Sequence, residues 1–313
     1  MQQHTYQTLL EVSKRVNWRV DDIIGGDKRL DFSKPFLPET FARTEALAFL
    51  SDRERLTLNH IRAHGYLAMF ALVEGFILPF VNTAIAQDDG TPHRAPALQQ
   101  FASEEEKHME LFRRFLIEFR EGFGSECGFL GPPEAIRDAV LAHGEMSVAI
   151  ATLGIEWMSQ AHYVESVRDD GDLDPQFKSL LKHHWQEESQ HARLDALLLK
   201  ELARKATPEQ IERAMNEYFE IGAFLDGGLR GLTELDLQSF ERATGRTLNA
   251  DQRAEFMQVQ HQAQRWTFLG SAMRNKNFLA ALGELGGGAC ARRGSVSDVL
   301  LMWQGWRRSG RQP

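Results

Sequence analysis

Residues 184–191 read HWQEESQH, and residues 105–108 read EEKH. Each stretch contains a glutamate followed three positions later by a histidine: Glu188 with His191, and Glu105 with His108. On a helix, side chains three residues apart lie on one face about one turn apart, so each pair can direct a carboxylate and an imidazole at a common point. Two copies of the same pair in one chain predict a shared site between two helices.

A further glutamate lies upstream of each pair, within apolar helical sequence. Glu74 precedes Glu105 by 31 residues, in LAMFALVEGFILPF, and Glu156 precedes Glu188 by 32 residues, in VAIATLGIEWMSQ. At about 1.5 Å of rise per residue, the two glutamates of each antiparallel helix pair reach the same height. Four glutamates and two histidines are therefore expected to converge at the middle of a four-helix bundle.

The rest of the chain is helical in pattern, without the alternating apolar and polar runs that precede hairpin turns. Capping and stop signals predict four long helices that make up this bundle. They run from Ser51 to about Gln87, from Pro96 to Gly122 and Gly124, from Pro132 to Asp169, and from Asp174 to Ala206.

Helices are also expected on both sides of the bundle. They comprise one amphipathic helix within 1–45, one starting at Thr207, one from Asn249 to the glycines at 286–288, and a short one within 294–313. No long linker or low-complexity segment interrupts the chain, which favours a single domain over 1–313. The sequence thus predicts an all-α fold with a bundle core at 51–206 and a helical C-terminal extension at 207–313.

Composition excludes several classes of function. Of the 313 residues 42% are hydrophobic, enough for a sizeable core, and the formal charge of −8 argues against non-specific nucleic-acid binding. The presence of only two cysteines, Cys127 and Cys290, excludes a disulfide framework and fits a reducing cytoplasm.

The N-terminus lacks the features of a signal peptide. The longest apolar run, residues 66–81, is short for a membrane span and carries Glu74, so we expect a buried helix and no membrane association.

Four carboxylates in a low-dielectric core need counter-charge, because isolated buried anions are costly. Two divalent cations would supply it. A mixed glutamate and histidine donor set suits iron, or manganese as a substitute, better than calcium or structural zinc. The sequence therefore predicts a centre with two metal ions.

This pattern resembles the ferritin-like di-iron carboxylate proteins, in which two helices each give a glutamate and two give Glu-x-x-His. His184 precedes Glu188 by four residues and shares its helical stripe. With this third histidine, and with LSDRERLTLNHIRAHGYLAMFALVEGFILPFV at 50–81, the chain is most similar to the p-aminobenzoate N-oxygenase family. The resemblance implies an iron-binding, catalytic set of seven residues: Glu74, Glu105, His108, Glu156, His184, Glu188 and His191.

The same resemblance implies a reaction and partners. It implies that the chain uses O2 and an external electron donor to convert a small aromatic amine into a hydroxylamine, nitroso or nitro product, as a homodimer. Two alternatives stay open at this point. One is a di-iron hydroxylase or desaturase that acts on C–H bonds, and the other is a non-catalytic protein that handles iron or senses O2.

Neighbouring side chains complete the predicted site. Related di-iron hydroxylases place an acid directly before each motif glutamate, and here this implies that Glu187 binds His108 and that Glu104 binds His191. A solvated helix surface is the alternative for both acids. Five further residues are candidate pocket walls or else core: Tyr163, Thr152, Phe70, Phe101 and Phe112.

Overall fold

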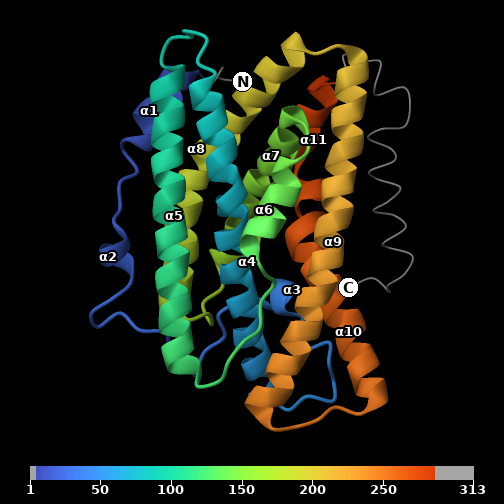
Figure 1. Ribbon diagram of the computed structural model, residues 1–313. Helices are drawn as coiled ribbons and strands as arrows, with labels where there is room; N and C mark the ends of the chain where they lie inside the picture. The colour runs from blue at the N-terminus through green and yellow to red at the C-terminus, as the bar shows by residue number, and fades with distance from the viewer. Residues whose placement is uncertain (1–4, 286–313) are drawn as a thin grey trace.

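The computed structural model describes residues 5–285, and within this range every regular element is a helix (Figure 1). Four long helices form the core: α4 (Asp52–Ala86), α5 (Arg94–Phe123), α7 (Glu145–His162) and α8 (Pro175–Lys205). Helix α4 packs along α5 and α7 packs along α8, while α5 also contacts α8 and α4 contacts α7. The predicted all-α fold with a four-helix bundle at its core is confirmed.

Additional helices surround the bundle. The N-terminal segment forms α1 (Tyr6–Ser13), α2 (Val20–Ile23) and α3 (Glu39–Ala42), and α1 packs on α5 and α8. After the core come α9 (Pro208–Thr244), α10 (Ala250–Arg265) and α11 (Lys276–Leu285), and α9 packs on α4 and α7. The helix predicted within 294–313, the glycines at 286–288 and Cys290 lie outside the described residues.

Helix α4 is the central element and carries the first glutamate of the predicted site. It begins at a capping box, in which the carboxylate of Glu54 accepts the backbone N–H of Ser51 at 2.8 Å. By length and composition this helix could cross a membrane, but 61% of its most apolar stretch is buried inside the protein. Its packing confirms the prediction of a buried core helix.

A buried ion pair joins α4 to α9. The Arg62 guanidinium lies 3.4 Å from the Asp236 carboxylate, and both side chains are about 2% exposed. The Gln264 amide of α10 donates to the same carboxylate at 2.9 Å. Charges this deep are tolerated only when they are paired and hydrogen-bonded, so the pair fixes how the C-terminal helices sit on the bundle.

The predicted start of α5 at Pro96 is wrong, since the helix begins at Arg94. Pro96 is the third residue of the helix, where the backbone N–H has no intrahelical partner, so a proline is tolerated there. The Arg94 side chain anchors this first residue of α5 by donating to Glu201 at 3.0 Å and to the Ala84 carbonyl at 2.8 Å.

The helix predicted from Pro132 to Asp169 is broken in the structure. It divides into α6 (Pro133–Leu141), α7 and a π-helical segment, η1 (Tyr163–Val167). The first break falls at Gly144, whose backbone N–H donates to the Glu217 carboxylate of α9 at 2.7 Å. This tertiary contact competes with the helical hydrogen bond, and the sequence gives no sign of it.

The long helix predicted from Asn249 is also interrupted. A π-helical segment, η2 (Trp266–Gly270), and a short 3-10 segment, η3 (Ala272–Arg274), separate α10 from α11. The side chain of Asn275 caps the start of α11 by accepting the backbone N–H of Asn277 at 2.9 Å. It also donates to the Trp157 carbonyl at 2.9 Å. Asn275 is thus a helix cap that also ties this segment to α7.

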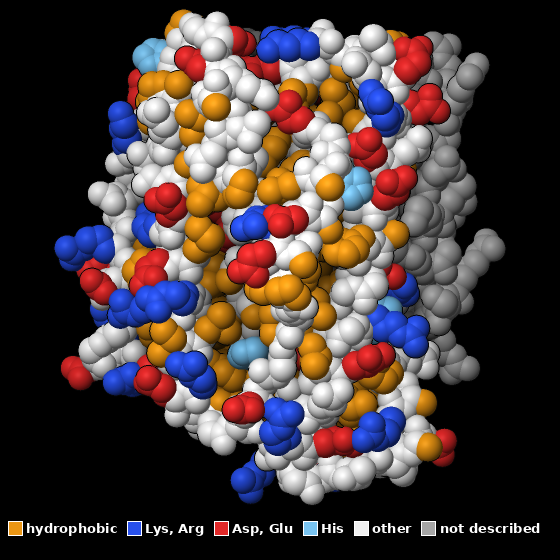
Figure 2. All heavy atoms as spheres, viewed as in Figure 1, with side chains coloured by type: hydrophobic (Ala, Val, Ile, Leu, Met, Phe, Trp, Pro, Cys, Tyr) orange, Lys and Arg blue, Asp and Glu red, His pale blue; other side chains and the backbone are white. Residues whose placement is uncertain are grey.

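On the face shown in Figure 2, basic and acidic side chains are interspersed, and apolar side chains gather toward the middle of the face. No large area of a single charge sign is visible on that face.

Candidate metal centre

The seven predicted ligand residues meet inside the bundle, and each residue is at most 4% exposed. Helix α4 supplies Glu74, α5 supplies Glu105 and His108, α7 supplies Glu156, and α8 supplies the other three. The matched spacings of the two helix hairpins therefore place all of these residues at the same height, as the sequence predicts.

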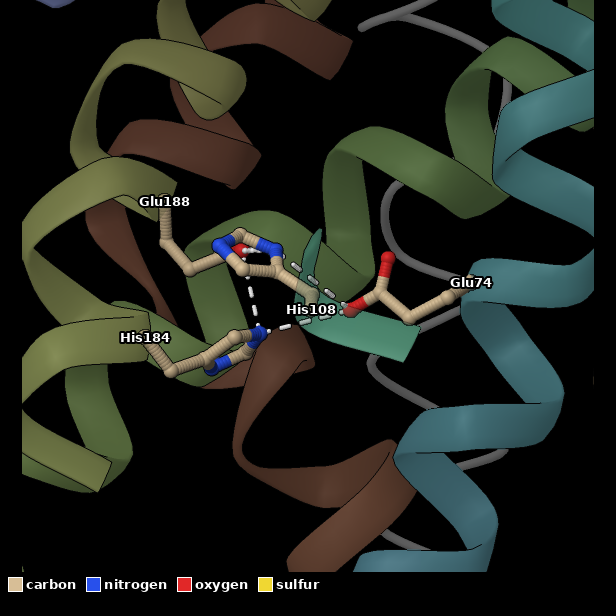
Figure 3. A group of neighbouring side chains, drawn as sticks. All are labelled: Glu74, His108, His184 and Glu188. Atoms are coloured by element: carbon tan, nitrogen blue, oxygen red, sulfur yellow. Dashed lines mark hydrogen bonds and ion pairs between the residues drawn. The ribbon is translucent and has the colours of Figure 1, made fainter. Parts of the chain in front are cut away.

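Two groups of donor atoms lie close enough to hold metal ions. In the first, shown in Figure 3, Glu74, His108, His184 and Glu188 point toward one another from three helices, with all ligand atoms within 4.8 Å of each other. The second group is equally tight and consists of Glu105, His108, Glu188 and His191. The two groups share His108 and Glu188, so the ions they could hold would be neighbours.

Glu156 belongs to neither group but borders both. Its carboxyl group shares a hydrogen bond with Glu188. Burial, and then the nearby Glu188 carboxylate, raise the pKa of Glu156 well above its ordinary value. A protonated Glu156 bonded to Glu188 is what two buried carboxyl groups adopt when no cation lies between them.

The converging donor atoms show that the cluster fits metal ions. Buried polar atoms normally have hydrogen-bond partners, because an unsatisfied one costs about 1–3 kcal/mol. Around this centre seven buried atoms make no hydrogen bond of ordinary geometry: Oε2 of Glu74, both oxygens of Glu105, Nδ1 of His108, Oε2 of Glu156, Oε1 of Glu188 and Nδ1 of His191. Several of them instead face one another at ion-pair distance, such as Nδ1 of His191 and Oε1 of Glu105 at 2.8 Å. Carboxylate and imidazole atoms that converge in this way are the donor set that two cations require.

The charges of the cluster are strongly coupled. Burial alone would lower the pKa of His108, but the carboxylates of Glu105, Glu187 and Glu188 outweigh it and raise that pKa well above the ordinary value. For His191, burial is likewise outweighed, chiefly by Glu105 and Glu188. Conversely, the neighbouring histidines bring the pKa of Glu188 well below its usual range despite burial. Without metal, protons on the imidazoles thus supply the counter-charge.

Both predicted outer pairings are present. Nε2 of His108 lies 2.9 Å from Glu187, and Nε2 of His191 lies 2.9 Å from Glu104. Glu187 and Glu104 are 0% and 2% exposed, so neither lies on a solvated helix surface. Each carboxylate occupies the outer nitrogen of its imidazole and turns Nδ1 toward the centre.

The N-terminal segment closes the site from one side. The Ser13 hydroxyl, at the end of α1, donates to Glu104. Trp18 stacks on His108, with ring centroids 6.0 Å apart and planes at 13°, and the Lys107 ammonium lies 4.0 Å above the Trp18 ring. Nothing in the sequence pattern indicates these contacts, because they join segments about ninety positions apart.

The five candidate pocket residues are all buried, at 0–6% exposure. Phe70 and Phe112 lie edge-on to His184, with ring centroids 5.3 and 5.0 Å away, and Phe101 stacks on His191 at 4.2 Å. The Thr152 hydroxyl, one turn before Glu156, has no hydrogen-bond partner. Tyr163 instead stacks on Trp185, with ring centroids 4.7 Å apart.

A separate apolar cavity of about 90 Å³ lies beside α7, and none of the five candidates lines it. It is bounded by residues of α7, α9, η2 and η3, among them Gly154, Tyr218 and Phe268. The ring of Phe268 packs on Phe70 at 6.3 Å, and Phe70 packs on His184, so two aromatic rings lie between this cavity and the metal centre.

Sequence reasoning missed one buried acid beside the centre, Asp195, which feels the charges of His191, Glu105 and Glu188. It is 1% exposed, and neither of its carboxylate oxygens has a hydrogen-bond partner. Burial raises its pKa well above the ordinary value. Asp195 follows His191 by four residues, so extending the same helical stripe by one turn would have identified it.

Searches with protein-family models and against curated proteins give no match. A search of solved structures matches variants of an R2-like ligand-binding oxidase. One with an aerobically reconstituted Fe/Fe cofactor has a TM-score of 0.47 and 16% identity, covering 85% of this chain and 93% of that chain. Another, with an anaerobically reconstituted Mn/Fe cofactor, has a TM-score of 0.46 and 17% identity, covering 85% and 94%. These similarities are too low to support an assignment, so the case for a metal centre rests on the residues of this chain alone.

Proposed function

We propose that this chain is a non-haem di-iron oxygenase that uses O2 to oxidise a small aromatic amine at its nitrogen. The observation that carries the proposal is the place of His184. Its Nε2 lies 3.0 Å from Oε1 of Glu188 and 3.3 Å from Oε1 of Glu74, inside the donor cluster. A third imidazole among the ligands is the feature that the arylamine N-oxygenase resemblance requires.

The donor set matches two Fe(II) ions in charge and in ligand type. Four glutamate carboxylates, Glu74, Glu105, Glu156 and Glu188, carry the negative charge that two divalent cations neutralise. Three neutral imidazoles add donors without adding charge, so the centre stays less anionic than a further carboxylate would make it. When bound, the iron pair supplies the reduction of O2 and the transfer of an oxygen atom to the substrate.

The chain's own contribution begins with the orientation of the ligands. Glu187 and Glu104 hold the outer nitrogens of His108 and His191, which fixes the tautomer and the ring plane of each ligand. Both carboxylates are buried, so these hydrogen bonds are not weakened by competition with water.

The chain also keeps water out and favours a flat, apolar substrate. Phe70 and Phe112 pack edge-on against His184, the third histidine. Aromatic walls offer stacking and edge-to-face contacts to an arene ring while binding water poorly. A small arylamine combines such a ring with a nucleophilic nitrogen, and therefore suits this surface better than a long alkyl chain does.

The direct test supplies Fe(II)-loaded protein with a panel of aminoarenes, a chemical reductant and ¹⁸O2. We expect hydroxylamine, nitroso or nitro products that carry ¹⁸O, detected by mass spectrometry. Labelled phenols or benzylic alcohols would instead indicate C–H oxidation. Consumption of O2 with accumulation of ferric iron and no organic product would indicate iron handling, and either result would refute N-oxygenation.

A further inference from the structure

A tyrosine and a histidine form a buried pair next to the metal centre. The hydroxyl group of Tyr66, on α4 two turns before Glu74, lies 2.9 Å from Nδ1 of His162, the last residue of α7. Tyr66 is 4% exposed and His162 is 3% exposed. Neither belongs to the seven donors of the metal centre, so their role needs a separate explanation.

The hydrogen bonds fix which atom holds each proton. Nε2 of His162 lies 2.9 Å from the carbonyl oxygen of Thr267, and a carbonyl can only accept. Nε2 therefore carries the imidazole hydrogen and Nδ1 carries the lone pair, so the Tyr66 hydroxyl donates to Nδ1. Burial lowers the pKa of His162 to about 3 and raises that of Tyr66, which keeps both groups neutral at physiological pH. The pair is thus a phenol aimed at a vacant base.

One aromatic ring connects this phenol to the metal centre. The ring centroid of Phe70 lies 4.7 Å from that of Tyr66 and 5.3 Å from that of His184. On its other sides the pair is covered by Phe268, 5.7 Å from Tyr66, and by Phe41, 4.5 Å from His162. Adjacent aromatic rings form a short path for a single electron, and the surrounding rings exclude water from it.

We propose that Tyr66 and His162 form a one-electron redox site that serves the metal centre. Tyr66 gives one electron, through Phe70 and His184, to the metal pair after that pair has been oxidised by O2, and its hydroxyl proton moves to Nδ1 of His162. The O–H bond breaks and an N–H bond forms, leaving a neutral phenoxyl radical, an imidazolium and a metal pair reduced by one electron. An external one-electron donor reverses the step, and the proton returns to Tyr66.

The proton transfer is what makes the electron transfer feasible in this environment. A phenol that lost only an electron would become a buried cation without a partner, which is costly in a low dielectric. After the transfer, the positive charge lies on an imidazolium whose other nitrogen donates to the Thr267 carbonyl. The oxidant in this step is the iron pair after its reaction with O2. Only this part of the proposal rests on the proposed function.

Tyr218 provides a matched control within the same chain. Tyr218 is partly buried, and its hydroxyl donates at 3.3 Å to Sδ of Met273, a thioether that does not serve as a base. An oxidised Tyr218 would have no acceptor for its proton. Tyr6 does have a proton acceptor, since its hydroxyl donates to Glu201 at 2.8 Å. Tyr66 combines its base, His162, with the Phe70 contact that leads to His184.

The first experiment needs no iron. Metal-free protein is oxidised by flash-generated tris(bipyridine)ruthenium(III), frozen and examined by EPR, with ring-deuterated tyrosine to identify the radical. We expect a tyrosyl signal in the wild type and in Tyr218→Phe, and its loss in Tyr66→Phe and in His162→Gln, which removes the base but leaves the phenol. A signal that survives Tyr66→Phe would overturn the redox site. Thermal unfolding of each variant shows whether the fold is retained.

The second experiment tests the link to the metal. Protein loaded with Fe(II) is mixed with O2, freeze-quenched and examined for the same signal, which we expect in the wild type and not in Tyr66→Phe. A radical in the flash experiment together with its absence here, in protein that consumes O2, would overturn the link. Protein that binds no iron or consumes no O2 would refute the proposed function instead, while the flash experiment still decides the redox site.

Discussion

His108 and Glu187 face each other across the bundle, with Nε2 of the imidazole 2.9 Å from a carboxylate oxygen. This contact turns Nδ1 of His108 inward, where it lies 3.1 Å from Oε1 of Glu188. His191 is oriented in the same way by Glu104, and its Nδ1 lies 2.8 Å from Oε1 of Glu105. His184 differs, because it presents Nε2 to Glu74 and Glu188. Two imidazoles are thus set by outer carboxylates, and the third is set by packing against aromatic rings.

The outer carboxylates should matter for metal affinity. Glu104→Gln and Glu187→Gln keep the side-chain size but remove the charge that orients each imidazole, so Fe(II) affinity or turnover should fall about 10- to 100-fold. Glu106→Gln is the matched control, since Glu106 is exposed on the same helix. Titration of anaerobic protein with Fe(II) measures the effect. Equal affinity and turnover in all three variants would remove Glu104 and Glu187 from the site.

The third histidine should separate metal binding from the reaction. His184→Ala leaves six of the seven donors, so we expect it to retain the fold and much of the iron but to lose most of the arylamine oxidation. His183→Ala is the control, because Nδ1 of His183 bonds at 2.7 Å to a carbonyl of its own helix. Iron content and product yield are compared for both variants. Normal turnover by His184→Ala would make this histidine a bystander.

Metal binding should release protons. Neighbouring carboxylates raise the pKa values of His108 and His191 well above their ordinary value despite burial, which favours protonated imidazoles when no metal is bound. A cation must displace these protons, and apparent affinity should therefore rise as pH increases from about 6 to about 8. Mn(II), used as a redox-silent ion, allows this to be followed by calorimetry in buffers of different ionisation enthalpy. Affinity that is independent of pH, with no proton release, would contradict the assignment.

The buried Arg62–Asp236 pair should contribute strongly to stability. Asp236→Ala leaves the Arg62 charge buried and uncompensated, which is expected to cost about 3–5 kcal/mol in the free energy of unfolding. The measurement is urea denaturation at about pH 8, because burial raises the pKa of Asp236 to about 7 and the carboxylate is ionised above it. Glu234→Ala on the same helix is the control, since its partner Arg230 is 70% exposed. Equal stability of the two variants would contradict this role.

The bundle and the seven clustered residues could be predicted from sequence because helical periodicity is local. Spacings of three, four and seven residues determine which side chains share a stripe, and the matched offsets of the two hairpins determine their height. The helix breaks could not be predicted in this way. They depend on contacts between distant segments, such as Glu217 with Gly144 and Asn275 with the Trp157 carbonyl. The Tyr66–His162 pair could not be predicted for the same reason, since its members are 96 positions apart.

The central claim is that the clustered carboxylates and imidazoles hold two metal ions. Protein loaded anaerobically with Fe(II), freed of unbound metal and analysed for iron, should contain about two irons per chain, as a pair about 3.5–4 Å apart. Glu156→Ala should bind less, because it removes a donor and leaves metal charge unbalanced. One iron per chain or none, in protein whose circular dichroism shows an intact helical fold, would contradict the account.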